Sequence, residues 1–170
     1  MKELLTYIIH LVISFTTVYL VFEFSSLESN FINNAGVFFL VYFFLWLASY
    51  FYDRSHFVKV IKAIGLLLYF LKELGLASLV VAWDVITPRL NVESGVVALP
   101  LDAKTNLEIT ILASLISLTP GTLSLDVSED RRILYVHAVY IKKGDVEGLK
   151  RGIKNGFEKK LLEITRNYYG

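Results

Sequence analysis

The chain has 170 residues, of which 55% are hydrophobic and 14% aromatic, and its mean hydropathy is +0.55. These values exclude an ordinary soluble protein and indicate a membrane protein. The net charge is only +1, from 17 Lys and Arg against 16 Asp and Glu. Because nucleic-acid binding depends on a positive surplus, we expect no nucleic-acid partner. Cysteine is absent, which excludes disulfides and thiolate-held iron–sulfur clusters within the chain.

Hydrophobic residues are concentrated in the first half of the chain. All of the 12 Phe except Phe157 precede Pro88, whereas 12 of the 17 Lys and Arg lie from Pro88 onward. Such a shift in composition separates parts that fold in different surroundings. We therefore expect a membrane domain over residues 1–87 and a soluble domain over residues 88–170.

Two uncharged runs are long enough to cross a lipid bilayer as helices. Residues 4–22 and 35–52 contain no Asp, Glu, Lys or Arg, and a helix of about 20 residues spans a hydrocarbon core of roughly 30 Å. A cleavable signal peptide is the competing interpretation of the first run. That run is long and rich in aromatic residues, however, and no small-x-small cleavage pattern follows it. Both runs are therefore predicted to be transmembrane helices.

The charges beside these runs predict their orientation. The connection after the second run carries Arg54, Lys59 and Lys62, whereas the loop between the runs carries Glu23 and Glu28 and no basic residue. Basic residues are enriched in short cytoplasmic loops. We therefore expect a multi-pass protein of the cell membrane whose C-terminal domain is cytoplasmic if two helices span the bilayer. Three spans would place that domain outside.

A third apolar region, residues 57–86, leaves two interpretations open. At about 100° per residue its polar side chains fall near one line of a helix, while apolar residues cover the rest of the circumference. We favour a helix at the cytoplasmic membrane interface with this stripe toward water. The alternative is a third span whose charges face partner helices. The stripe consists of Lys59, Lys62, Leu66, Tyr69, Glu73, Ala77 and Asp84.

The soluble half is predicted to begin with a strand and a helix. The short apolar run within residues 93–101 is bounded by Gly and Pro, which is typical of a buried strand. Thr105 and Glu108 have the spacing of a capping box, in which each side chain satisfies a backbone amide at a helix start. The helix should end near Leu118.

The remaining residues predict a β-hairpin and a last helix. In residues 122–127, Leu and Val alternate with Ser and Asp, so we expect a strand that buries its Leu and Val side chains and exposes Ser and Asp. Polar residues 128–131 connect it to an apolar strand over residues 133–141, and Asp145 can cap the last helix. The order β-α-β-β-α makes a small α+β domain.

Between the predicted helix and hairpin, the sequence Thr-Pro-Gly-Thr at residues 119–122 predicts a type II turn. Pro120 presets φ at the second turn position, and Gly121 accepts the positive φ of the third at no steric cost. We expect Pro120 and Gly121 to form a structural turn that ends the helix and begins the strand.

The predicted helix at residues 107–118 has more apolar surface than one small sheet can cover, because its Leu and Ile residues extend nearly all the way round. We therefore expect part of it to dock against neighbouring subunits or against the chain's own interfacial helix. The residues of this possible docking face are Leu107, Ile111, Leu115 and Leu118.

Few residues suggest chemistry. Lys72 and Glu73 could belong to an ion path, since charges within a membrane are often functional, or could simply be wet or pack against helices. His10 and His137 have no companion at metal-ligand spacing, so we expect structural roles and no metal. Glycines recur at residues 148, 152 and 156. They could form a face that packs closely against a partner, or an exposed stripe on a weakly formed part of the helix. No catalytic or phosphate-binding motif appears, and we expect neither enzyme activity nor a cofactor.

A resemblance to a known family lies mainly in residues 98–141, ALPLDAKTNLEITILASLISLTPGTLSLDVSEDRRILYVHAVYI. This segment resembles the body of the E subunit of Mrp-type (Mnh-type) multisubunit cation/proton antiporters. The sequence YFLKEL, residues 69–74, resembles the segment that precedes it in that family. The likeness covers most of the chain, closely from about Tyr69 to Glu158 and weakly in the first two apolar runs.

The resemblance implies a non-catalytic integral membrane subunit of a monovalent cation (Na+)/proton antiporter. Its C-terminal domain would be cytoplasmic, and its partners would be the lipid bilayer and other hydrophobic subunits that carry the ions. Related modules are built into Mrp-related respiratory complexes such as membrane-bound hydrogenases, which stay open as an alternative. A second alternative is a carrier that takes a direct part in ion transport through Lys72 and Glu73.

Overall fold

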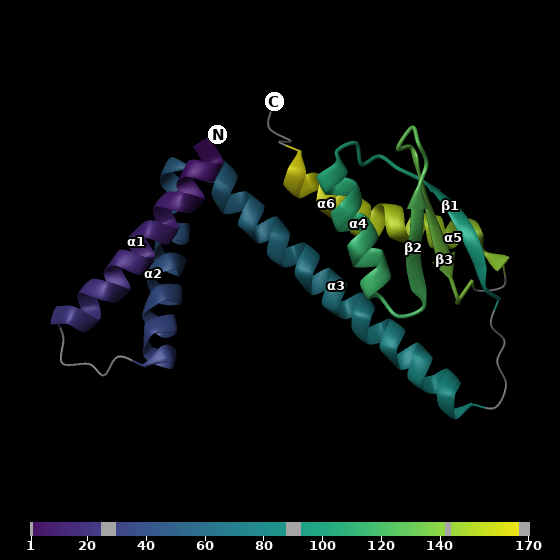
Figure 1. Cartoon of the computed structure of the whole chain (residues 1–170), viewed down its shortest axis with the longest axis horizontal. Helices are drawn as coiled ribbons and strands as arrows, with labels where there is room; N and C mark the ends of the chain where they lie inside the picture. Colours follow the sequence, from purple (N-terminus) through teal and green to yellow (C-terminus); the bar gives the residue numbers. More distant parts are fainter. Residues whose placement is uncertain (1, 25–29, 88–92, 142–143, 167–170) are drawn as a thin grey trace. The chain divides into compact units, whose positions relative to one another are not determined.

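The structure, a computed structural model, describes residues 2–24, 30–87, 93–141 and 144–166 (Figure 1). The chain divides into two compact units, Met1–Ile61 and Lys62–Gly170, which we call the N-terminal and C-terminal units. This division falls inside a long helix. Because residues 88–92 lie outside the described part, the predicted domain boundary near Pro88 stays a prediction.

Three helices within the described residues are long and apolar enough to cross a membrane. They are α1 (Lys2–Phe24), α2 (Phe31–Tyr52) and α3 (Arg54–Ile86), and the first two pack against each other in the N-terminal unit (Figure 1). Asn30 begins α2 by accepting a hydrogen bond from the Asn33 amide at 2.9 Å, as an N-cap residue does. The predicted membrane half is confirmed as three apolar helices.

The N-terminal unit buries polar rather than apolar side chains. Among its described residues, the fully buried ones are His10, Ser14, Ser49 and His56, each at most 1% exposed. Most of its large apolar side chains are exposed, as expected of helices whose surroundings are lipid or other membrane helices.

The C-terminal unit contains the end of α3 and a small α+β domain, hereafter the small domain. Its elements are β1 (Gly95–Pro100), α4 (Asn106–Leu118), β2 (Thr122–Val127), β3 (Ile133–Ala138), α5 (Val146–Ile153), the π-helical segment η2 (Lys154–Glu158) and α6 (Lys159–Thr165). The three strands form an antiparallel sheet in the order β1-β3-β2. The predicted order β-α-β-β-α is confirmed.

One face of the sheet carries the core, and α4 and the α5–α6 segment cover it. Thr105 and Glu108 form the predicted capping box at the start of α4. The core is made by apolar residues from both strands and helices: Leu99, Leu112, Ile116, Leu134, Val136, Ile153, Phe157 and Leu161.

The predicted facing of β2 is wrong over its first four residues. Leu123 and Leu125 are 52% and 51% exposed, whereas Ser124 lies toward α4 and donates from its hydroxyl to the Ala113 carbonyl at 3.0 Å. A β-bulge between Ser124 and Asp126 shifts the alternation, so Val127 packs against the core. Strict alternation in a sequence cannot reveal a bulge or choose which face is buried.

Other strands and the last helix also depart from expectation. β1 is buried on one face only, because Val97 and Leu99 face the core while Val96 is 60% exposed. β3 ends at Ala138 rather than at residue 141. The predicted single last helix is interrupted by the π-helical turn η2.

Candidate functional site

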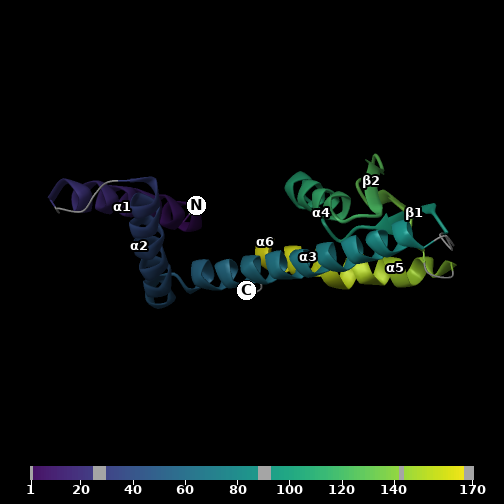
Figure 2. The ribbon, with the colours of Figure 1, turned by 90° about the horizontal axis from the view of Figure 1, so that it is seen from below.

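Within the C-terminal unit, from Lys62 onward, the predicted polar stripe of α3 faces the small domain. Leu66, Tyr69 and Phe70 pack against the core of that domain, and the Tyr69 and Phe157 rings meet edge-on with centroids 5.2 Å apart. Figure 2 shows α3 along the side of the small domain that carries α5 and α6. The stripe therefore faces the chain's own small domain, whereas the sequence interpretations placed it toward water or toward partner helices.

Polar contacts hold α3 to the small domain on both sides of this apolar contact. Lys62 donates from Nζ to the Glu163 carbonyl of α6 at 3.1 Å. Further along α3, Asp84 accepts a hydrogen bond from the Tyr140 hydroxyl, and this bond raises the pKa of Tyr140. The opposite side of α3 carries exposed apolar side chains: Ile64, Leu67, Leu68 and Leu71.

One of the three recurring glycines permits the close approach of α3. Gly156 lies buried in η2, and a side-chain carbon there would be 2.7 Å from Tyr69 Cζ and would collide with the Tyr69 hydroxyl. Gly152, by contrast, is exposed and has open space around it. Gly156 is thus a packing position, while Gly152 belongs to an exposed surface.

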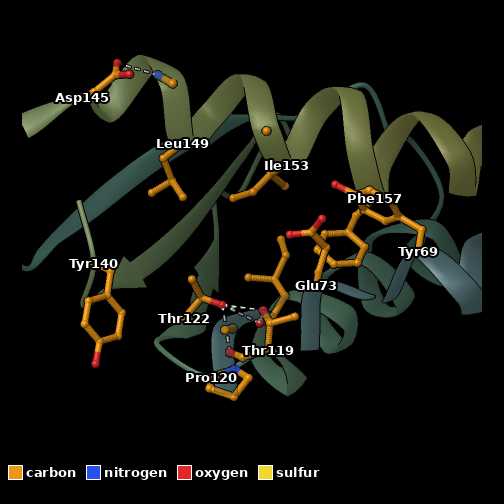
Figure 3. A pocket seen from close by; sticks show the side chains of 14 residues that line it. Tyr69, Glu73, Thr119, Pro120, Thr122, Tyr140, Asp145, Leu149, Ile153 and Phe157 are labelled. Atoms are coloured by element: carbon orange, nitrogen blue, oxygen red, sulfur yellow. Dashed lines mark hydrogen bonds between the residues drawn. The ribbon is translucent and has the colours of Figure 1, made fainter. Parts of the chain in front are cut away.

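A cavity of about 460 Å³ lies between α3, the α4–β2 turn and α5 (Figure 3). Its walls are mainly apolar, and Glu73 and Asp145 are the acidic groups among the described lining residues. The Asp145 carboxylate accepts from the Gly148 amide at 2.8 Å, as the N-cap of α5. Thr119 and Thr122 both donate to the Ile116 carbonyl at 2.6 Å. These polar groups serve the fold, and no nucleophile and base converge here among the described residues.

Lys72 and Glu73 pair with each other on α3. Lys72 Nζ lies 3.3 Å from Glu73 Oε1, with side chains 64% and 32% exposed. Lys72 also lies over the Tyr69 ring, 5.7 Å from its centroid. An exposed pair of this kind contributes little to stability, and the Glu73 carboxylate additionally lines the cavity.

The turn at residues 119–122 has type II geometry. Gly121 has φ of +87°, and the Thr122 amide donates to the Thr119 carbonyl at 3.3 Å. A Cβ at Gly121 would also lie 2.7 Å from Cδ2 of Tyr140. Gly121 is therefore required by both backbone conformation and space, and the turn forms one wall of the cavity through Pro120.

Two buried carboxylates, Glu108 and Glu158, connect separate segments of the small domain. The sequence indicated only Glu108, through the capping box. Glu108 accepts from the Lys104 and Thr105 amides as the capping box requires, but also from the Thr165 hydroxyl of α6 at 2.6 Å. Burial by itself would raise the pKa of Glu108. The hydrogen bonds from Thr165 and the two amides, together with nearby Arg166, outweigh burial and lower the pKa from 4.5 to about 2.

Glu158 was not singled out from the sequence. It is 1% exposed and accepts from the Asp102 and Ala103 amides at 2.6 and 2.9 Å. Lys154 Nζ lies 3.1 Å from Glu158 and 2.7 Å from the Asp102 carboxylate, and although burial opposes it, this pairing raises the pKa of Lys154. The sequence signal for this ion pair was the four-residue spacing of Lys154 and Glu158, which places both side chains on one face of a helix. Both carboxylates are structural, since each is engaged by backbone amides.

The predicted docking face of α4 is divided. Leu107 and Leu118 are 65% and 62% exposed, whereas Ile111 and Leu115 are partly buried and pack against the core of the small domain. Of the four predicted docking residues, therefore, only the two at the ends of α4 are exposed.

A second apolar surface lies on the outer face of the sheet, away from the core. Val96, Leu123, Leu125 and Tyr135 are all exposed, and pairing places Val96 and Leu123 on either side of His137. We call these five residues the outer sheet face. The sequence did not predict this surface, because Leu123 and Leu125 were expected to be buried.

Comparison with known proteins agrees with the fold and identifies the family. The chain is 42% identical over 131 residues to the E subunit of the Na(+)/H(+) antiporter of Alkalihalophilus pseudofirmus, covering 77% of this chain and 79% of that protein. It is 40% identical over 144 residues to the protein of the same name from Bacillus subtilis, covering 81% of this chain and 89% of that protein.

A solved structure shares the fold over nearly the whole chain. A chain of the membrane-bound sulfane sulfur reductase, an archaeal respiratory membrane complex, has 24% identity and a TM-score of 0.54, covering 91% of this chain and 98% of that one. The sequence model of the MNHE family, described as Na+/H+ ion antiporter subunit, matches residues 12–164. With this match and relatives of at least 40% identity, the chain belongs to the MNHE family of Na+/H+ ion antiporter subunits.

Proposed function

We propose that the chain is a non-catalytic integral membrane subunit of a Na+/proton antiporter complex. It supports assembly, while partner subunits carry the ions. Two relatives of at least 40% identity are named as E subunits of Na(+)/H(+) antiporters, which supports the antiporter complex over a respiratory complex. The likeness to the sulfane sulfur reductase complex supports the shared fold only.

The observation that carries the assembly role is the outer sheet face. Three of its residues, Val96, Leu123 and Leu125, are each more than half exposed. Aliphatic side chains at adjacent sheet positions mark an interaction surface, and burying one Leu contributes roughly 1.5–3 kcal/mol. A hydrophobic partner subunit that covers this face would provide that burial. Leu107 and Leu118 on α4 offer further apolar contact.

The packing of α3 supports a position at the membrane interface. Between Lys62 and Asp84, one side of α3 contacts the small domain and the other side is apolar and exposed. A spanning helix would draw the charged surface of that domain into the bilayer, where each charge is costly. An interfacial α3 keeps its apolar side in lipid and the domain in water. With two spans, the small domain is then cytoplasmic.

The carrier alternative rests on Lys72 and Glu73. Their mutual ion pair and the 64% exposure of Lys72 support a surface role rather than a path for ions through this chain. On the assembly proposal, removing both charges leaves transport nearly intact.

The test compares two double variants in the complete complex, isolated from membranes. Leu123→Glu with Leu125→Glu should lower the yield of partner subunits that copurify with this chain, because the outer sheet face loses its apolar contact. The antiport activity of each assembled complex should change little. Lys72→Gln with Glu73→Gln should change neither quantity.

Thr110→Glu is the matched control, since it adds a charge at an exposed position of the same domain. If the Lys72 and Glu73 variant abolishes transport at full yield, the carrier function is correct instead. Undiminished yield with the two Leu→Glu changes would reject the outer sheet face as the docking surface.

A further inference from the structure

The interior of the N-terminal unit brings titratable side chains from α1 and α3 into contact. Thr6, His10 and Ser14 recur every four residues on α1, so they lie along one side of that helix. His10 and Ser14 are fully buried there, as is His56 in the first turn of α3. In membrane helices, buried ionisable groups are costly and commonly functional.

The two imidazole rings are neighbours. The centroids of His10 and His56 lie 5.0 Å apart with the rings perpendicular. Tyr7 of α1 meets His56 edge-on at 4.3 Å, and Tyr42 of α2 meets His10 at 5.9 Å. All three helices of the unit thus contribute a ring to the same cluster.

Asp53, at the junction of α2 and α3, supplies a negative charge to this cluster. Its carboxylate accepts from the Thr6 hydroxyl of α1 at 2.9 Å and from the His56 amide at 3.2 Å. It therefore joins α1 to the first turn of α3. Arg54 and Lys59 are the other described charges near it on α3, and Arg54 lies over the Tyr50 ring.

We propose that His10 and His56 form a proton-binding site that holds a single proton between them, with the Asp53 carboxylate as its counter-charge. One imidazolium is stabilised by the carboxylate. A second positive charge only 5.0 Å away is opposed by repulsion that little solvent screens in a buried site. The two rings therefore titrate as a coupled pair, in which the state of each depends on the other.

Proton binding at this site strengthens the attachment of α1 to α3. An imidazolium attracts the carboxylate that already receives the Thr6 hydroxyl, whereas two neutral imidazoles leave that carboxylate without a cationic neighbour in the pair. The site thus makes the packing of the N-terminal unit sensitive to proton concentration. This role is independent of the assembly function, which depends on the outer sheet face.

The test uses the small number of histidines. The chain has 3, namely His10, His56 and His137, so the full chain labelled with 15N-histidine in lipid nanodiscs yields three sets of imidazole signals. Titration from about pH 4 to about pH 9 follows the protonation of each ring, because the imidazole nitrogen shifts change with charge. Single His→Gln variants assign the signals.

We expect the His10 and His56 signals to change in two shared steps. In His56→Gln, His10 should titrate in a single step whose midpoint differs by about one pH unit or more from its wild-type value, and the reciprocal should hold in His10→Gln. Asp53→Asn should lower the midpoint of the first step, because the counter-charge is lost. The proposal is overturned if the two rings titrate independently, or if neither titrates.

Two controls separate proton coupling from a packing change. His137→Gln removes a histidine of β3 in the other unit and should leave both curves unchanged. Ser14→Ala removes a buried polar group one turn from His10 that carries no charge. If Ser14→Ala shifts the His10 midpoint as far as His56→Gln does, the effect is structural and the proton-binding site is rejected.

Discussion

Tyr69 of α3 lies directly over Gly156 of η2, in the place that a side chain at residue 156 would occupy. The Tyr69 ring is also edge-on to Phe157, with centroids 5.2 Å apart. The π-helical turn that carries Gly156 therefore presents bare backbone to α3. This contact joins an apolar helix to the core of the small domain.

Gly156→Ala should loosen the contact between α3 and the small domain. The new methyl group must displace the Tyr69 ring, and overpacking of this kind typically costs about 1–3 kcal/mol. We expect faster proteolysis of the small domain in the full chain held in lipid nanodiscs. Tyr69→Phe in the same chain should restore part of the resistance by removing the hydroxyl.

Gly152→Ala is the control for this prediction. Gly152 is exposed in the same helical region with open space around it, and alanine favours a helix by roughly 1 kcal/mol over glycine. Its protease resistance should equal or exceed that of the wild type. Equal behaviour of the two alanine variants would mean that Gly156 has no packing role.

Gly121→Ala should destabilise the small domain for two separable reasons. A φ of +87° disfavours any residue with a Cβ by about 1–3 kcal/mol, and that Cβ also meets the Tyr140 ring. In Tyr140→Ala with Gly121→Ala, only the backbone penalty should add to the effect of Tyr140→Ala alone. Thermal unfolding of all four chains measures both contributions. Full additivity of the two changes would show that the ring contact is unimportant.

The sequence predicted elements far better than it predicted faces. Thr105 and Glu108 identified the start of α4 because a capping box is local. The facing of Leu123 and Leu125 depended on the bulge after Ser124 and on the hydrogen bond from Ser124 to Ala113, which involve β3 and α4 and not β2 alone. The pattern within one strand cannot specify how that strand pairs and packs against other elements.

The same distinction explains the site residues that were missed. Glu158 contacts Asp102 and Ala103, more than 50 residues earlier. Likewise, His10 has no histidine at a helical spacing on α1, since its partner His56 comes from another helix. The polar stripe of α3 was identified correctly, but periodicity gives the residues on a face and not what covers it.

Protonation of Glu108 should destabilise the small domain at low pH. Its pKa is about 2 in the folded chain against an ordinary 4.5, so the unfolded state binds a proton first. The stabilisation is full above about pH 4.5 and is lost as the pH falls through about 2, and it amounts to at most roughly 3 kcal/mol. Glu108→Gln should be less stable at neutral pH and should flatten the pH dependence of unfolding over this window. Glu129→Gln, at an exposed hairpin position, is the control.

The orientation of the small domain can be tested with single cysteines, because the chain contains none. Ile32→Cys, exposed at the start of α2, and Glu129→Cys, exposed in the β2–β3 hairpin, are suitable positions. With two spanning helices and an interfacial α3, an impermeant thiol reagent added to right-side-out vesicles should label Ile32→Cys. Glu129→Cys should be labelled only after the vesicles are opened, since basic residues after α2 retain that side in the cytoplasm. Labelling of Glu129→Cys in sealed vesicles would instead require α3 to cross the bilayer, and the small domain would then lie outside.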